Sequence, residues 1–333
     1  MKKLLFSVAA LAFCACSNDE VVSENNAANQ QPKEISFAPL AKPNTRAAVD
    51  GIGFPNINMM VTAYDASNTR AFFDATTFSK SGDTWVAGKY WPLAPATINF
   101  LAIANANENN EAGVTWGTNK ADQVTIVMSD NSTAQRDLMY ACGTGSVTQP
   151  SNALEFPTNV PMIFKHAQAW IKFTVKANSA TEVSKLTVNS ITLNSVSCAG
   201  TFAVTHANYD KTAAQRTAAT PAGALNGSVS GVWSAYSASA GNKAVSKPDG
   251  FVLSTSEQAF GDLMVVPDQG MASFTINYTV DGNAYNYTYT PASTSLAQAT
   301  KYVYNISFGL HEILIAPQVA DWTDGGTTAV QPQ

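Results

Sequence analysis

The chain has 333 residues, of which 45% are hydrophobic and 13% charged, and its net charge is −5. This length suits two domains. Because the balance is acidic and no stripe of lysine and arginine exists, the composition excludes a nucleic-acid-binding surface. Beyond the amino-terminal leader no apolar run approaches about 20 residues, so no second segment is expected to span a membrane.

The amino terminus has the layout of a bacterial lipoprotein signal. Lysines at residues 2–3 precede an apolar run at residues 4–13, which is too short to cross a bilayer. A small residue precedes Cys16 and acidic residues 19–20 follow it, so Cys16 is the predicted lipidation site and Cys14 a weaker one. Lipidation would anchor the precursor to the outer membrane, whereas the alternative is an ordinary cleaved secretory signal.

The body of the chain alternates with the period of two that half-buried strands require. Residues 35–37 form a short candidate first strand. Apolar residues at every second position predict strands at residues 56–64 and 167–175. Almost wholly apolar runs predict buried strands at residues 98–104 and 124–128.

A second series of strands includes residues 186–196 and 302–308. The strongest local signal is Asp281-Gly282, which lies between alternating runs at residues 274–280 and 285–289. A type I′ turn needs positive φ at both central residues, and Asp-Gly supplies it. This tyrosine-rich hairpin is expected close to the edge of a sheet.

Two regions lack strand patterns. Residues 206–250 show no clear period and are expected to form a long variable loop, and residues 132–140 one or two helical turns. The many short strands with turn residues between them favour an all-β fold of two antiparallel β-sandwich domains. We expect these domains at residues 47–182 and 183–333.

Side chains with catalytic or metal-binding chemistry are few. His166, His206 and His311 occur in unrelated segments without metal-ligand spacing, and His166 is expected to be a hydrogen-bonded structural residue. No nucleophile elbow, phosphate-binding loop or dinucleotide fingerprint appears. The sequence therefore predicts no catalytic residue, cofactor or metal. Cys142 and Cys198 remain after loss of the leader, either as a disulfide or as separate buried thiols.

Several motifs, in order along nearly the whole chain, resemble those of the fimbrillin family, the shaft subunits of type V pili in Gram-negative anaerobes. They are the lipoprotein leader, Thr45-Arg46-Ala47, and segments at residues 90–92, 135–139, 164–167, 263–267, 302–306 and 319–322. The resemblance implies two transthyretin-like β-sandwiches in tandem. It also implies a signal peptide at residues 1–16 and a propeptide at residues 17–46.

The same resemblance implies a route of assembly. An arginine-specific protease cuts the precursor between Arg46 and Ala47 and releases the first strand together with the lipid. The opened groove then receives the carboxyl-terminal strand of an identical subunit, here within residues 312–333. Pro39 and Pro43 disfavour strand pairing near the cut. The alternative for Arg46 is an ordinary solvated loop arginine.

The carboxyl-terminal segment has the pattern of a donor strand. Ile313, Ile315 and Val319, together with Pro317, share one face that ends at Trp322. Burial of such side chains contributes about 1.5–3 kcal/mol each. The alternative is an ordinary last strand that pairs within its own domain.

The sequence therefore favours a non-enzymatic pilus subunit that polymerises with identical subunits, contacts anchor and tip subunits, and supports adhesion from the cell surface. A second hypothesis is a glycan-binding surface lipoprotein whose tryptophans, Trp85, Trp91, Trp116 and Trp233, stack on sugars. A third is an anchor or tip subunit of the same pilus. An anchor should lack the arginine cut, and a tip should lack the donor strand.

Overall fold

The computed structural model describes residues 31–40, 58–65, 71–104, 114–116, 123–127, 137–151, 153–197, 199–206, 229–236, 240–267, 269–292, 295–310 and 312–321. Most of these residues form strands, and the only helix among them is the single turn α1 (Ala180–Val183). No helix in this described part is long and apolar enough to cross a membrane. The all-β prediction is confirmed.

The amino-terminal sandwich is one eight-stranded sheet that folds over on itself, with the order β10-β8-β5-β2-β3-β4-β1-β9. Its strands are β1 (Phe37–Leu40), β2 (Met59–Asp65), β3 (Ala71–Ser81), β4 (Thr84–Val86), β5 (Ala96–Ala104), β8 (Met139–Val147), β9 (Val160–Ile163) and β10 (Lys165–His166). A Cβ added to Gly143 of β8 would lie 2.9 Å from the Val160 side chain of β9. Strands that are distant in the sheet order therefore face each other across a buried core.

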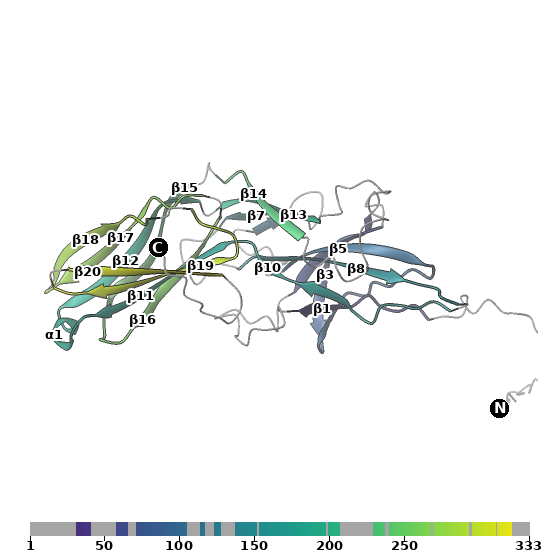
Figure 1. The fold of residues 1–333 in the computed structure, drawn as a ribbon, viewed down its shortest axis with the longest axis horizontal. Coiled ribbons are helices and arrows are strands. Elements are labelled where there is room, and N and C mark those ends of the chain that lie inside the picture. Colours follow the sequence, from purple (N-terminus) through teal and green to yellow (C-terminus); the bar gives the residue numbers. More distant parts are fainter. Residues whose placement is uncertain are drawn as a thin grey trace, which may run out of the picture.

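The carboxyl-terminal sandwich consists of two four-stranded sheets, β16-β11-β19-β20 and β15-β12-β17-β18. Their strands are β11 (Ala169–Ala177), β12 (Leu186–Ser197), β15 (Ala240–Val252), β16 (Gln258–Val265), β17 (Ser273–Val280), β18 (Asn283–Tyr289), β19 (Thr300–Phe308) and β20 (Ile313–Asp321). Phe274 of β17 contacts Tyr304 of β19, with 4.9 Å between ring centroids. The two sandwiches occupy opposite ends of an elongated molecule (Figure 1).

A fourth sheet, which also has four strands, connects the two halves of the chain. Its order is β14-β13-β7-β6, from β6 (Val114–Trp116), β7 (Gln123–Val127), β13 (Ala199–His206) and β14 (Val229–Ser234). Phe202 of β13 also packs edge-on against Tyr140 of β8, with 5.0 Å between ring centroids. One buried cluster therefore runs from the amino-terminal sandwich into the carboxyl-terminal one.

The sequence predicts the domain boundary at residues 182–183. In the structure, the strands of the carboxyl-terminal sandwich begin earlier in the chain. β11 lies ahead of that boundary, yet it pairs with β16 and β19 of the carboxyl-terminal sandwich. Its alternate residues Ile171, Phe173 and Val175 are fully buried, as the period-two pattern predicts. The change of partner sheets falls between β10 and β11.

Three local expectations differ from the structure. Part of residues 206–250 forms β14 and β15, which pair with β13 and β12. Met139 and Tyr140 begin β8 rather than ending a helix, because they pair with Ala104 and Ile103 of β5. Each sandwich also contains a parallel pair, β1 with β9 and β11 with β19, so neither is purely antiparallel.

The hairpin of β17 and β18 agrees with its sequence signal. Asp281 has a φ of 47° and Gly282 a φ of 80°, which are the positive values that a type I′ turn requires. β18 forms the edge of its sheet, and Tyr285 and Tyr287 on it are exposed. The predicted turn and the predicted edge position are both present.

The φ of Gly282 leads to a stability prediction with a matched control. No atom lies within 4 Å of a Cβ added at Gly282 or at Gly241, and only Gly282 has a positive φ. We expect Gly282→Ala to lower the free energy of unfolding by about 1–2 kcal/mol and Gly241→Ala to leave it almost unchanged. Denaturant unfolding measures both variants, and equal losses in the two would contradict the role of the turn.

Candidate functional site

β1 is the first strand among the described residues, and it lies between β4 and β9 in the amino-terminal sandwich. It pairs antiparallel with β4 at Phe37 and Trp85, and parallel with β9 from Phe37↔Val160 to Leu40↔Ile163. Removal of β1 would leave facing edges of both neighbours without a partner. An unpaired edge of this kind is a template for another strand.

Backbone hydrogen bonds extend this pairing ahead of β1. The Ile35 amide donates to the Lys89 carbonyl at 2.7 Å, and the Trp91 amide donates to the Lys33 carbonyl at 2.9 Å. On the other side, the Val160 amide donates to the Ser36 carbonyl at 2.8 Å. We call the residues that contact this strand, at positions 85–91 and 158–163, the β1 site.

Two side chains of the first strand complete the core of the sandwich. Ile35 and Phe37 are both 0% exposed. The Phe37 ring meets the rings of Phe78 and Phe100 edge-on, with centroids 4.8 Å and 5.0 Å away. Such aromatic pairs contribute about 0.5–1.5 kcal/mol beyond the burial of their area. The first strand is therefore part of the core and not a cover laid over it.

Polar contacts hold the outward-facing residues of the same segment. The Glu34 carboxylate accepts a hydrogen bond from the Gly88 amide at 2.6 Å, where Gly88 has a φ of 64°. The Ser36 hydroxyl donates to the Asn159 side-chain oxygen at 2.7 Å. Sequence reasoning did not identify Glu34 or Ser36, because their partners lie more than fifty residues away in the chain.

β20 contains the predicted donor residues Ile313, Ile315 and Val319. In the single chain it pairs antiparallel with β19, so that Ile313 faces Phe308 and Ile315 faces Ile306. β20 is the edge strand of its sheet, and Ile313 and Ile315 are only half-buried. Leu314 is 54% exposed and Val319 36% exposed. The apolar side chains of β20 are thus only partly removed from water in this position.

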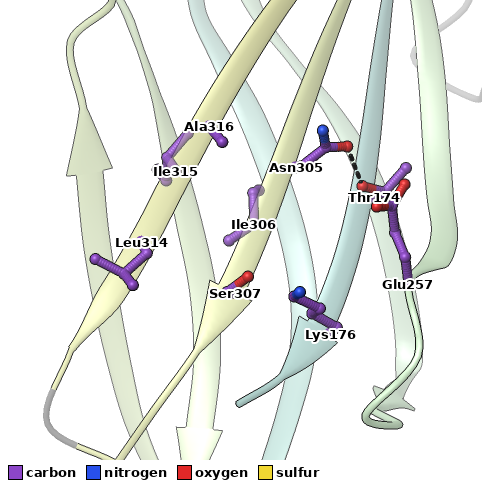
Figure 2. Close-up of a pocket in the computed structure, with 9 residues that line it drawn as sticks. All are labelled: Thr174, Lys176, Glu257, Asn305, Ile306, Ser307, Leu314, Ile315 and Ala316. Atoms are coloured by element: carbon purple, nitrogen blue, oxygen red, sulfur yellow. Dashed lines mark hydrogen bonds between the residues drawn. The ribbon is translucent and has the colours of Figure 1, made fainter.

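The outer face of the sheet around β20 has a shallow hollow of about 430 Å³. Figure 2 shows Leu314 and Ala316 of β20 beside Asn305 and Ser307 of β19, with Lys176 of β11 at the side. The Thr174 hydroxyl donates to the Asn305 side-chain oxygen at 2.6 Å. The residues that line this hollow include no histidine and no cysteine.

Three of the four tryptophans considered for sugar stacking are buried. Trp85 is 5%, Trp91 3% and Trp233 5% exposed, and the side chain of Trp116 is outside the described residues. The Trp91 ring meets the Phe100 ring edge-on at 5.8 Å. These three side chains pack in the protein interior and present no aromatic platform to solvent.

His166 is a buried structural residue, as predicted. Its Nδ1 atom lies 2.9 Å from the Asp137 carboxylate, and both side chains are buried. Among the described residues, no group of three or more histidine, cysteine, aspartate and glutamate side chains could hold a metal ion.

Several predicted positions lie outside the described residues: Cys16, Arg46, Ala47, Cys198, His206 (side chain only), His311 and Trp322. Cys142 is buried on β8. Burial raises the pKa of its thiol to about 12, and nearby Lys165 lowers it slightly. At neutral pH this group is therefore a thiol rather than the nucleophilic thiolate.

A family model described as fimbrillin-like matches residues 44–322. No curated protein matches the chain. Among solved structures, a candidate cell adhesion protein from Bacteroides uniformis has a TM-score of 0.53 at 16% identity, over 87% of this chain and 99% of that one. A fimbrial protein from Bacteroides vulgatus has a TM-score of 0.53 at 14% identity, over 88% and 100% of the two chains. At these identities the likeness is one of fold.

The buried position of Phe37 predicts how much the first strand stabilises the uncut chain. Phe37→Ala leaves a cavity against Phe78 and Phe100, and such a change costs about 3–5 kcal/mol. Phe72→Ala removes the same atoms from a side chain that is 44% exposed, so its cost should be much smaller. Denaturant unfolding of the uncut protein measures both, and similar losses would show that Phe37 does not support the core.

Proposed function

Because the chain belongs to the fimbrillin-like family, we propose that it is a structural subunit of a type V pilus. It is exported as an outer-membrane lipoprotein precursor with the acyl chains on Cys16, and it then enters a fimbrium on the cell surface. There it contacts identical subunits and the anchor and tip subunits, and it supports adhesion. The observation that supports the proposal is the β1 site, where the strand ahead of Arg46 completes a hydrophobic core.

Proteolysis after Arg46 is the proposed trigger. β1 ends at Leu40, so a cut between Arg46 and Ala47 separates it from the rest of the subunit. The match to the fimbrillin-like family begins at residue 44, which leaves the first strand ahead of the shared region. Once its covalent connection is lost, the strand is held only by hydrogen bonds and by the burial of Ile35 and Phe37.

Donor-strand exchange then restores what the cut removes. Loss of the first strand empties the pockets of two large apolar side chains. Burial of two such side chains of a donor strand there would contribute about 3–6 kcal/mol before costs are subtracted. Ladder hydrogen bonds add about 0.5–1.5 kcal/mol each, and association costs about 4–15 kcal/mol. The net affinity is therefore modest. Durability of the fibre comes from slow release, because a leaving donor strand must expose the core again.

The alternatives lose support on specific grounds. The tryptophan platform considered for glycan binding loses support because Trp85, Trp91 and Trp233 are buried. An anchor subunit would not need Arg46, and a tip subunit would not need the apolar face of β20. We therefore favour a shaft subunit.

The trigger predicts a dependence on one of the four arginines of the chain. Treatment of the purified precursor with an arginine-specific protease should expose Ala47 as a new amino terminus and yield SDS-resistant ladders. Arg46→Ala should abolish the ladders because β1 stays attached, whereas Arg216→Ala should preserve them. Amino-terminal sequencing and gel electrophoresis give the result, and ladders from the Arg46→Ala protein would refute the trigger.

A further inference from the structure

Two segments at opposite ends of the chain share a six-residue pattern. Residues 34–39 read Glu-Ile-Ser-Phe-Ala-Pro, and residues 312–317 read Glu-Ile-Leu-Ile-Ala-Pro. Glutamate, isoleucine, alanine and proline coincide, and the fourth position holds a large apolar residue in both. The first copy occupies the β1 site, and the second forms the beginning of β20 with the residue before it.

In the first copy, the shared residues make the contacts that hold the strand. Glu34 accepts the hydrogen bond of the Gly88 amide. Ile35 and Phe37 alternate into the core and are fully buried. The third position, Ser36, points outward to Asn159, and it is there that the two copies differ most in polarity.

In the second copy, the corresponding residues are less buried than in the first. Glu312 is exposed, and Ile313 and Ile315 are half-buried at the edge of a sheet, where β19 is the one neighbouring strand in the described part of the chain. Transfer of these two side chains to a site where their counterparts are fully buried would remove further apolar area from water. That gain favours the β1 site over the position next to β19.

We propose that β20 of one subunit enters the β1 site of the next in the register that superposes the two copies, parallel to β9. This inference rests on the proposed function and adds to it the register and the contacts. Glu312 takes the place of Glu34 and accepts the Gly88 amide. Ile313 takes the place of Ile35, and Ile315 takes the place of Phe37.

The differences between the copies explain why the cut is needed. Ile315 is smaller than Phe37 and cannot reproduce its ring contacts with Phe78 and Phe100. The first strand therefore fills the site better, and as long as it is tethered it also has the advantage of a high effective concentration. Cleavage removes the tether, so the released strand is diluted while β20 remains attached to a subunit.

The register can be tested by disulfide formation between neighbouring subunits. Ser36 and Asn159 are in side-chain contact, so the proposal places Leu314 of the donor beside Asn159 of the acceptor. The full chain carrying Leu314→Cys and Asn159→Cys, after cleavage and oxidation, should give covalent dimers and longer ladders that survive boiling in SDS and disappear with reductant. Chains with only one of these substitutions control for the native cysteines.

A matched pair tests the neighbouring register. Ala316 lies on the same face two residues along the strand, about 6.6 Å away, and a disulfide does not form over such a displacement. Ala316→Cys with Asn159→Cys should therefore give no covalent ladder. If this pair crosslinks and the Leu314 pair does not, the register is wrong although strand exchange occurs. If cleaved, unsubstituted protein forms no polymer, the proposed function fails together with the register.

A gain-of-stability variant tests the pocket itself. Ile315→Phe should restore the ring contacts made by Phe37 and raise the temperature at which the ladders dissociate, whereas Leu314→Phe should leave it unchanged because position 314 faces outward. Gel electrophoresis after graded heating measures this temperature. The same shift in both variants, or no shift with Ile315→Phe, would overturn the assignment of Ile315 to the Phe37 pocket.

Discussion

The amino-terminal sandwich depends on a hydrophobic core that is completed by β1 and the residues just ahead of it. Ile35 and Phe37 are fully buried, and Phe37 lies at the centre of an aromatic group with Phe78 and Phe100. An empty site would destabilise the sandwich, because the residues around it would lose both apolar burial and direct contacts. The same strand also pairs with β4 and β9. Its removal would leave an apolar groove with two unpaired edges, which is a template for another extended strand.

The two sandwiches differ in how firmly they hold their terminal strands. The first strand has neighbours on both sides and its inward side chains are inaccessible to water. Among the described strands β20 has one neighbour, and it carries an exposed Leu314 and a partly exposed Val319. The two copies of the six-residue pattern thus lie in different surroundings. The first has a strand on both sides and is fully buried on its inner face, and the second lies at a sheet edge and is half-buried. If β1 were removed, the proposed exchange would fill its site with the less firmly held strand of a neighbouring subunit.

The sequence predicted what depends on local chemistry. Period-two alternation located β11 and the β17–β18 hairpin, and Asp281-Gly282 identified the turn, because these signals involve residues adjacent in the chain. The parallel pairing of β1 with β9, the early change of sandwich at β11 and the sheet formed by β7 and β13 all join distant segments, and no local pattern encodes them. The same limit applied to Glu34, since its partner Gly88 becomes visible only when the strand is in place.

Side chains must set the register of any strand in the β1 site, because backbone hydrogen bonds repeat along a strand and accept every shift of two residues. A shift of one residue would turn Leu314 and Ala316 inward and expose both isoleucines. A shift of two in one direction would put Leu314 where Glu34 meets the Gly88 amide, which removes the acceptor. A shift of two in the other direction would place His311 in the apolar pocket of Ile35, where a polar ring lacks partners. Only the register that aligns the two copies of the pattern avoids all three costs.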